Sequence, residues 1–296
     1  MAARSPRLIV VGVTLLACAL TLDAQPAPAR RIISLVPALT EMLFAIGAGS
    51  DVIAVSSYDS FPAEVEKLPR VGALLDPDTE RILSMRPELV IIYGSQGDLK
   101  TQLTRTGIRV FEYRHGGLAH VLSTLRTLGA ATGRQAEAER VAAGIEQGLT
   151  EIRTRVAGRP RPRTLLVFGR EPLSLRNLYA SGGVGFLHDV LVLSGGLNVF
   201  GDVKRESAQV STEALLAAAA EVIVELRIGE TPDSEQIRRE RDPWMRFTAI
   251  PAVKNGRIQI LYGDHLVVPG PRIAQAAEEI ARAIHPDAFR AARQAN

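Results

Sequence analysis

The sequence contains almost no cysteine: the single one, Cys18, lies in the first apolar stretch. One cysteine can form no internal disulfide and no multi-thiolate metal site. Lysine is also scarce, occurring only at Lys67, Lys100, Lys204 and Lys254, and the net charge of +3 is small. Because nucleic-acid binding needs a concentrated positive surface, this composition argues against a nucleic-acid partner.

Long apolar runs are missing as well. The most apolar segment, Leu8 to Leu22, is shorter than the roughly 20 residues that a membrane-spanning helix needs. Arg4 and Arg7 precede this segment and small residues follow it, which is typical of a secretory signal peptide. We therefore expect residues 1–24 to be removed on export. The letters LLAC suggest an alternative, a lipoprotein anchored at Cys18.

Familiar catalytic motifs are absent. The chain has no G-x-S-x-G elbow and no H-E-x-x-H pair, and SGGVGF at residues 181–186 is only part of a phosphate loop. The histidines lack metal-ligand spacing. They are His115, His120, His188, His265 and His285. We predict a protein that is not an enzyme and has no built-in cofactor or metal site.

Strand-like and helix-like segments alternate along the chain. Apolar, β-branched runs alternate with amphipathic patterns over residues 30–133 and again over 160–285, which predicts two α/β lobes with parallel, Rossmann-like sheets. Residues 134–158 are rich in strong helix formers, with apolar residues at helical spacing, and predict one linking helix of roughly 30 Å. Residues 286–296 are expected to be a tail.

One phrase occurs twice. DTERILSMRPELVIIY, residues 78–93, returns as STEALLAAAAEVIVEL, residues 211–226, without a gap. Identical residues recur 133 positions later at Thr79 and Thr212, Glu80 and Glu213, Leu83 and Leu216, and Glu88 and Glu221. The repetition indicates that the two lobes are related.

The repeat places one acid near the start of a helix in each lobe. We expect Asp78 and Ser211 to be N-caps, so that Glu80 and Glu213 fall in the first turn, where free amides and the helix dipole favour carboxylates by about 0.3–1 kcal/mol. Capping alone accounts for one such glutamate. Because related lobes place equivalent helix starts at equivalent edges, the pair also suits a partner that presents two matched arginines.

Three segments carry a resemblance to a known family: RIISLVPALTEMLFAIGAGSDVIAVSSYDSFPAEVEKLPRVG, PDTERILSMRPELVI, and GGLNVF followed by QVSTEALL. They resemble the periplasmic vitamin B12-binding proteins of ABC importers, within the helical-backbone metal-receptor group that also binds haem and ferric siderophores. The resemblance runs in order from about Arg30 to Ile284. It implies two α/β lobes joined by a single long α-helix, with the ligand in the cleft between them.

The resemblance also implies a function. A monomeric periplasmic protein would capture a corrinoid (vitamin B12) as transported ligand and deliver it to the permease dimer of an ABC importer. Glu80 and Glu213 would be the two docking acids that meet arginines of the permease.

Family positions point to a set of ligand contacts. Tyr58 stands where the family has a tyrosine that contacts the corrin ring, and a second contact segment aligns with Asp264, His265, Leu266, Val267 and Val268. Tyr93, Phe168 and Gly169 are expected at strand ends that face the cleft, where aromatic stacking on a flat ligand contributes about 0.5–1.5 kcal/mol per ring. Arg170 or Arg205 is expected to meet carboxamides or carboxylates of the ligand.

The sequence departs from the family pattern at several expected ligand contacts, so other ligands are considered as well. Leu74, Tyr93 and Ser207 occupy positions where the best-known member has tryptophans, and Trp244 lies elsewhere. With fewer rings and a histidine at His265, haem or a differently substituted corrinoid is an alternative ligand, and a ferric siderophore is a further alternative within the same group. The imidazole is a candidate axial ligand of iron or cobalt. We favour a role in which His265 only forms a hydrogen bond to the ligand or to the backbone.

Two other classes of protein are weighed against the transport protein. A two-lobed metal-cofactor enzyme, such as a metal-cluster oxidoreductase or a chelatase, would need cysteines or clustered acid and base residues that the sequence lacks. A sensor subunit that reports ligand without transport would not need both docking acids.

Overall fold

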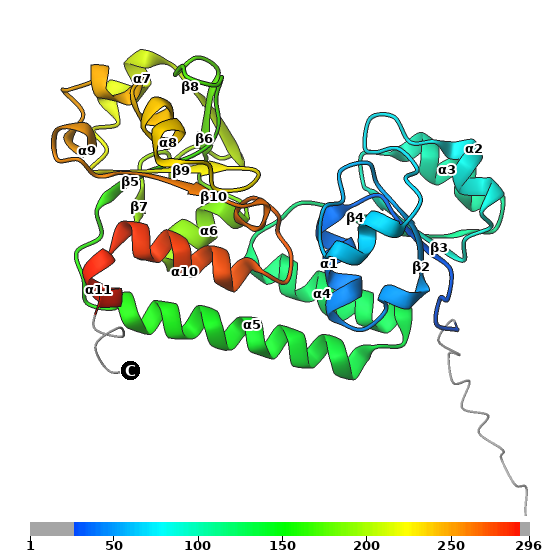
Figure 1. Ribbon diagram of the computed structural model, residues 1–296. Coiled ribbons are helices and arrows are strands. Elements are labelled where there is room, and N and C mark those ends of the chain that lie inside the picture. The colour runs from blue at the N-terminus through cyan, green and yellow to red at the C-terminus, as the bar shows by residue number, and fades with distance from the viewer. Residues whose placement is uncertain (1–26, 291–296) are drawn as a thin grey trace, which may run out of the picture.

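The structure is a computed structural model that describes residues 27–290 (Figure 1). The predicted signal peptide at residues 1–24 and the alternative anchor Cys18 lie outside the described residues. Two lobes stand side by side, and one long helix, α5 (Gln135–Val156), runs beneath both of them (Figure 1). Across residues 27–290 no helix has both the length and the apolar character that crossing a bilayer requires.

The N-lobe is built on a four-stranded, wholly parallel sheet with the order β2-β1-β3-β4. Its strands are β1 (Ile32–Ser34), β2 (Val52–Val55), β3 (Leu89–Tyr93) and β4 (Arg109–Tyr113). Its helices are α1 (Pro37–Ala45), α2 (Thr79–Ser84), α3 (Gly97–Arg105) and α4 (Leu118–Thr132), with 3₁₀ helices η1 (Gly49–Asp51) and η2 (Ala63–Lys67). The two central strands, β1 and β3, are buried on both faces, as their continuous apolar runs predict, whereas the edge strand β4 is mostly half-buried.

The C-lobe repeats this arrangement and adds to it. Its strands are β5 (Arg163–Gly169), β6 (Leu178–Ser181), β7 (Leu197–Asn198), β8 (Ser207–Val210), β9 (Val222–Arg227) and β10 (Ile258–Tyr262). The parallel order β7-β5-β9-β10 matches β2-β1-β3-β4 of the N-lobe, and antiparallel β6 and β8 extend the sheet beyond β5. The predicted α/β fold with parallel sheets is confirmed, and the antiparallel pair is an addition that the sequence pattern did not predict.

The helices of the C-lobe are mostly short. They are α6 (Phe186–Leu193), α7 (Thr212–Ala217), α8 (Ser234–Arg241), α9 (Pro251–Lys254), α10 (Ile273–Ile284) and α11 (Pro286–Arg290), with 3₁₀ helices η3 (Trp244–Arg246) and η4 (Asp264–Leu266). α11 starts the segment expected to be a tail, and its Phe289 is buried between the guanidinium groups of Arg155 and Arg282, 5.0 and 4.8 Å from the ring centre.

The repeated phrase folds the same way in both lobes. The Asp78 carboxylate accepts a hydrogen bond from the backbone N–H of Arg81 at 3.0 Å, and the Ser211 hydroxyl accepts one from Ala214 at 3.1 Å. Both predicted N-caps are therefore confirmed, at the starts of two helices of six residues each.

The second half of the repeated phrase contains, in each lobe, a glutamate that links two neighbouring strands. Glu88 Oε2 accepts a hydrogen bond from the backbone N–H of Arg30 at 2.8 Å, and Glu221 Oε2 accepts one from Arg163 at 2.7 Å. Each glutamate thus ties the start of one strand, β3 or β9, to the beginning of its neighbour: Glu88 binds Arg30 just before β1, and Glu221 binds Arg163, the first residue of β5. These two repeated acids stabilise the sheets, which distinguishes them from Glu80 and Glu213.

α5 packs mainly against α4 of the N-lobe and α10 of the C-lobe, and it also contacts α6. Its buried side chains recur at helical spacing: Ala138, Ala142, Ile145, Leu149, Ile152 and Val156. They belong to one continuous apolar core that includes residues of both lobes. A single packed helix bends less than several separate strands would, so we expect this connection to limit lobe motion.

Candidate functional site

A pocket of about 280 Å³ lies between the lobes. The N-lobe contributes His115, which follows β4, and the C-lobe contributes the other lining residues. These are Phe168, Val184, Gly185, Phe186, Leu187, Glu206, Ser207 and Val267. Mostly apolar walls with a few polar groups are typical of sites for organic ligands.

Aromatic rings form the N-lobe wall behind His115. The His115 ring centre lies 5.7 Å from that of Tyr93 and 5.3 Å from that of Tyr113, and His120 packs on Tyr113 at 6.2 Å. Burial raises the pKa of both tyrosine hydroxyls, so both stay protonated and neutral at physiological pH. His115 has no metal-ligand spacing in the sequence, and its place soon after a parallel strand is the signal that marks it as a cleft residue.

Large exposed side chains lie on two further loops of the N-lobe. The Gln96 side chain accepts a hydrogen bond from the Tyr93 backbone N–H at 3.0 Å and donates one to the Leu74 carbonyl at 3.1 Å, which holds the Leu74 loop beside the end of β3. Leu75 is 93% exposed, and Tyr58, two residues from a contact with the C-lobe at Ser60, is 76% exposed. Large side chains that are this exposed are free to contact a ligand.

The predicted contact loop Asp264–Val268 crosses to the N-lobe. Asp264 Oδ2 accepts a hydrogen bond from the Ser60 hydroxyl at 2.8 Å, while Oδ1 accepts one from the Gly229 backbone at 2.9 Å. These two hydrogen bonds lower the pKa of Asp264, so its charge persists at physiological pH. Of this loop, Val267 lines the pocket, Val268 is half-buried and Leu266 is fully buried.

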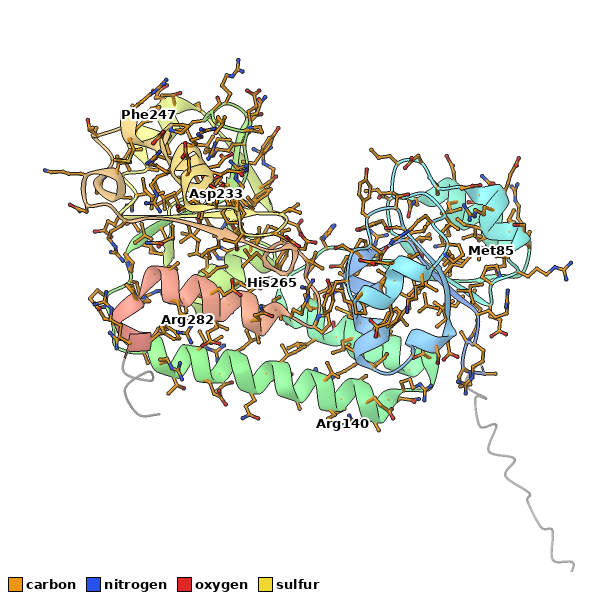
Figure 2. All side chains as sticks on the ribbon, viewed as in Figure 1. Met85, Arg140, Asp233, Phe247, His265 and Arg282 are labelled. Carbon is orange, nitrogen blue, oxygen red and sulfur yellow. The ribbon has the colours of Figure 1, made fainter. Side chains whose placement is uncertain are left out.

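His265 is buried where the loop meets the N-lobe (Figure 2). Its Nε2 lies 2.9 Å from Glu279 Oε1 of α10. The same ring lies against the backbone of Gly263, whose φ of +146° and close contact leave no room for a side chain. His265 therefore makes its hydrogen bond to a carboxylate within its own lobe and fixes the loop.

Arg170 is placed differently from what the sequence suggested. Its side chain has no exposed surface and forms ion pairs with Glu225 and Glu240, both at 2.9 Å. A guanidinium so enclosed has no donor left for a ligand, whereas Arg205 is exposed beside the pocket residue Glu206. Gly169, half-buried at the end of β5, packs against Tyr179.

A buried ion pair joins the two lobes. Glu41 of α1, 4% exposed, accepts two hydrogen bonds from Arg272, at 2.6 and 2.9 Å. The Arg272 guanidinium also covers the ring of Phe61 at 3.9 Å. Burial raises the pKa of Glu41, although Arg272 opposes this rise.

Removing the cation of the Glu41–Arg272 ion pair should destabilise the protein in a pH-dependent way. In Arg272→Gln the buried Glu41 charge loses its partner, so we expect the free energy of unfolding to fall by about 3 kcal/mol at neutral pH. Since the folded-state pKa of Glu41 is raised, stability is lost as the pH rises from the unfolded value, about 4.3, through the folded value, and it returns on acidification. Urea unfolding between about pH 4 and 7 measures the effect.

Arg239→Gln is the matched control, because Arg239 pairs with the exposed Glu235 at 2.8 Å. It should cost about 0.3–0.5 kcal/mol. A loss in Arg272→Gln that is the same at every pH would show that Glu41 is not its source.

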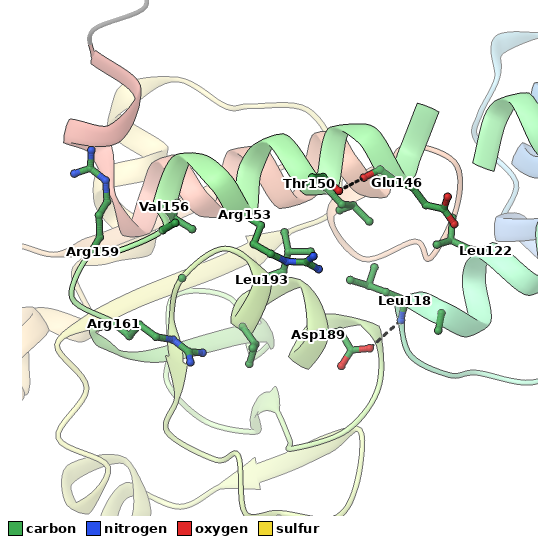
Figure 3. Close-up of a pocket in the computed structure, with 16 residues that line it drawn as sticks. Leu118, Leu122, Glu146, Thr150, Arg153, Val156, Arg159, Arg161, Asp189 and Leu193 are labelled. Atoms are coloured by element: carbon green, nitrogen blue, oxygen red, sulfur yellow. Dashed lines mark hydrogen bonds between the residues drawn. The ribbon is translucent and has the colours of Figure 1, made fainter. Parts of the chain in front are cut away.

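A larger groove, of about 750 Å³, also lies against α6 and shares no lining residue with the first pocket (Figure 3). It is bounded by α4, α5 and α6, and Asp189 of α6 accepts a hydrogen bond there from the backbone N–H of Leu118 at 2.9 Å (Figure 3). None of the ligand residues that the sequence suggested lines this groove. The smaller pocket between the lobes is therefore the better candidate site.

The two helices that begin the repeated phrase share one side of the molecule. α2 and α7 each lie at the end of their lobe farthest from α5 (Figure 1). Glu80 and Glu213 are both exposed, and within residues 27–290 neither carboxylate forms a salt bridge or a hydrogen bond. Each acid is thus available to a partner.

Two α/β lobes that face each other across a pocket and share one helical spine define a bilobal binding protein. The chain matches the periplasmic binding protein family over residues 32–264 and belongs to that family. The vitamin B12-binding protein of Salmonella typhimurium is 32% identical over 273 residues, which cover 91% of this chain and 96% of the relative.

Solved structures show the same architecture. The periplasmic vitamin B12-binding protein of Vibrio cholerae superposes with a TM-score of 0.74 at 25% identity, covering 89% of this chain and 99% of its own. A periplasmic haem-binding protein from Pseudomonas aeruginosa gives a TM-score of 0.74 at 24% identity, with 87% and 93% covered. The latter likeness shows the fold alone.

Proposed function

We propose that the protein captures a corrinoid of the vitamin B12 class in the periplasm and delivers it to an ABC permease. The observation that carries the proposal is its 32% identity, over nearly the full length of both chains, to a protein named for binding vitamin B12. Residues 1–24 would direct export, and attachment at Cys18 is the alternative. Because the family is periplasmic, the ligand would be met outside the cytoplasmic membrane.

The cleft suits one face of a large, flat macrocycle. Phe168 and Phe186 offer aromatic surface from the C-lobe, and Tyr58, Tyr93 and His115 offer it from the N-lobe. A pocket of about 280 Å³ holds only part of such a ligand, so the remainder would lie across the exposed rims. Arg205, exposed beside the pocket residue Glu206, would meet its polar side groups, whereas Arg170 is buried in ion pairs.

Calorimetric titration tests the proposal. Purified protein is mixed separately with cyanocobalamin, haemin and a ferric siderophore, and saturable 1:1 binding of the corrinoid is expected. Phe168→Ala should weaken that binding about 10-fold, since an aromatic contact and its buried area contribute more than 1 kcal/mol. The control is Phe247→Ala, which changes a half-buried ring in the separate core of the C-lobe. Tight haemin binding without corrinoid binding would overturn the proposed ligand.

A further inference from the structure

The imidazole of His115 differs from those of the other histidines in its surroundings. Three of them are engaged: Nδ1 of His188 with Asn198, Nε2 of His265 with Glu279, and Nε2 of His285 with the Gly195 carbonyl. Within residues 27–290, His115 and His120 have no side-chain hydrogen bond of this kind. Of those two, only His115 lines the pocket between the lobes.

The position of His115 is fixed by its neighbours. Its ring packs against the rings of Tyr93 and Tyr113, whose centres lie 5.7 and 5.3 Å away. The next two residues are glycines without room for a side chain, because a Cβ at Gly116 would lie 2.7 Å from His120 and one at Gly117 would lie 2.2 Å from Asp189. The imidazole is therefore exposed to the cleft on a loop that is closely packed on its other side.

The surroundings of His115 suit coordination of a metal held by a ligand. The facing wall presents Phe168, Phe186 and Val267, which give an apolar environment, and one acid, Glu206. The charge of Glu206 also contributes to the raised pKa of Tyr113, which places this carboxylate near the N-lobe wall. Imidazole is a good ligand for cobalt and iron, and a nearby carboxylate orients such a histidine through its second ring nitrogen.

We propose that His115 coordinates the cobalt of a corrinoid bound in this cleft. The inference rests on the proposed function. The lone pair of one ring nitrogen forms the bond to Co(III), and the water molecule on that axial face leaves. No electron is transferred, and a protonated imidazole would first release its proton to solvent. A corrinoid with exchangeable water would be retained by this bond, whereas one with firmly held cyanide would bind by contacts alone.

Visible absorption of the cobalt centre reports this exchange directly. Aquocobalamin mixed with the unaltered protein should change its spectrum to that of an imidazole complex, and His115→Ala should leave the spectrum of the free corrinoid. His120→Ala is the matched control, an exposed histidine of the same ring cluster outside the pocket, and should keep the change. Cyanocobalamin should bind all three proteins without a spectral change.

Affinity supplies a second measurement. The unaltered protein should prefer aquocobalamin over cyanocobalamin by 10-fold or more, and His115→Ala should remove this preference. If no corrinoid binds at all, the proposed function fails. If corrinoids bind but the spectrum never changes, or changes equally in His115→Ala, only the role of His115 is wrong. Loss of the change in His265→Ala instead would assign coordination to the contact loop.

Discussion

Reversing the charge of both Glu80 and Glu213 to lysine should abolish the proposed delivery of the ligand to an ABC permease and leave ligand affinity unchanged. Both carboxylates are exposed, and α2 and α7 lie on the same side of the molecule, away from α5. Where each acid would meet an arginine of the permease, a lysine instead places two positive charges together, at a cost of several kcal/mol. We expect docking of the double variant to weaken more than 100-fold and each single variant to lose part of it.

The folded state should tolerate these changes. A lysine in the first turn of a helix loses about 0.3–1 kcal/mol of dipole interaction, which is small beside the stability of a domain. Docking is measured with permease reconstituted in nanodiscs, and uptake is measured with labelled corrinoid. Glu151→Lys is the matched control, because Glu151 is an exposed helical acid on α5. Undiminished docking of the double variant, or an equal loss in the control, would contradict the assignment.

The second large effect concerns the buried ions of the C-lobe. Arg170→Leu removes the cation that binds Glu225 and Glu240, and its buried guanidinium also donates to the Ser174 carbonyl at 2.8 Å. Leaving buried carboxylates without that partner should lower the free energy of unfolding by about 3–5 kcal/mol. The lower end is expected, because Arg227 donates to Glu240 at 2.8 Å and stays in place.

Urea unfolding followed by tryptophan fluorescence measures this loss. Trp244, the single tryptophan of the chain, is fully buried and donates from Nε1 to Glu225 at 2.9 Å, so its emission reports on this cluster. Arg176→Leu is the control, since its side chain is 81% exposed and its pair with Glu171 is worth at most about 1 kcal/mol. Equal stability of the two variants, with ligand affinity lost only in Arg170→Leu, would restore Arg170 as a ligand contact.

Local patterns predicted the parts of the fold that depend on neighbouring residues. The N-caps Asp78 and Ser211 act on backbone amides three residues away, so the repeated phrase was enough to place them. The parallel sheets followed from strands that alternate with helices. The β6–β8 pair was missed because its short segments carry too few apolar residues to stand out from the surrounding loops.

Side-chain roles that depend on distant partners could not be read from the sequence. Arg170 follows a strand end, where ligand contacts are common, but Glu240, which binds it, lies 70 residues further along the chain. The partner of His265, Glu279, is closer in sequence, yet the pair forms only because η4 folds back onto α10. The sequence does not mark His115 as a ligand residue, because the residues that complete the pocket around it come from the opposite lobe and are distant in sequence.

A crystal structure of the protein with cyanocobalamin tests most directly whether the cleft between the lobes is the ligand site. The corrin ring should lie between the two lobes, against Phe168 and Phe186 on one side and against Tyr58 and the His115 wall on the other. Ligand density in the groove bounded by α4, α5 and α6, or on the outer face of a single lobe, would contradict the account.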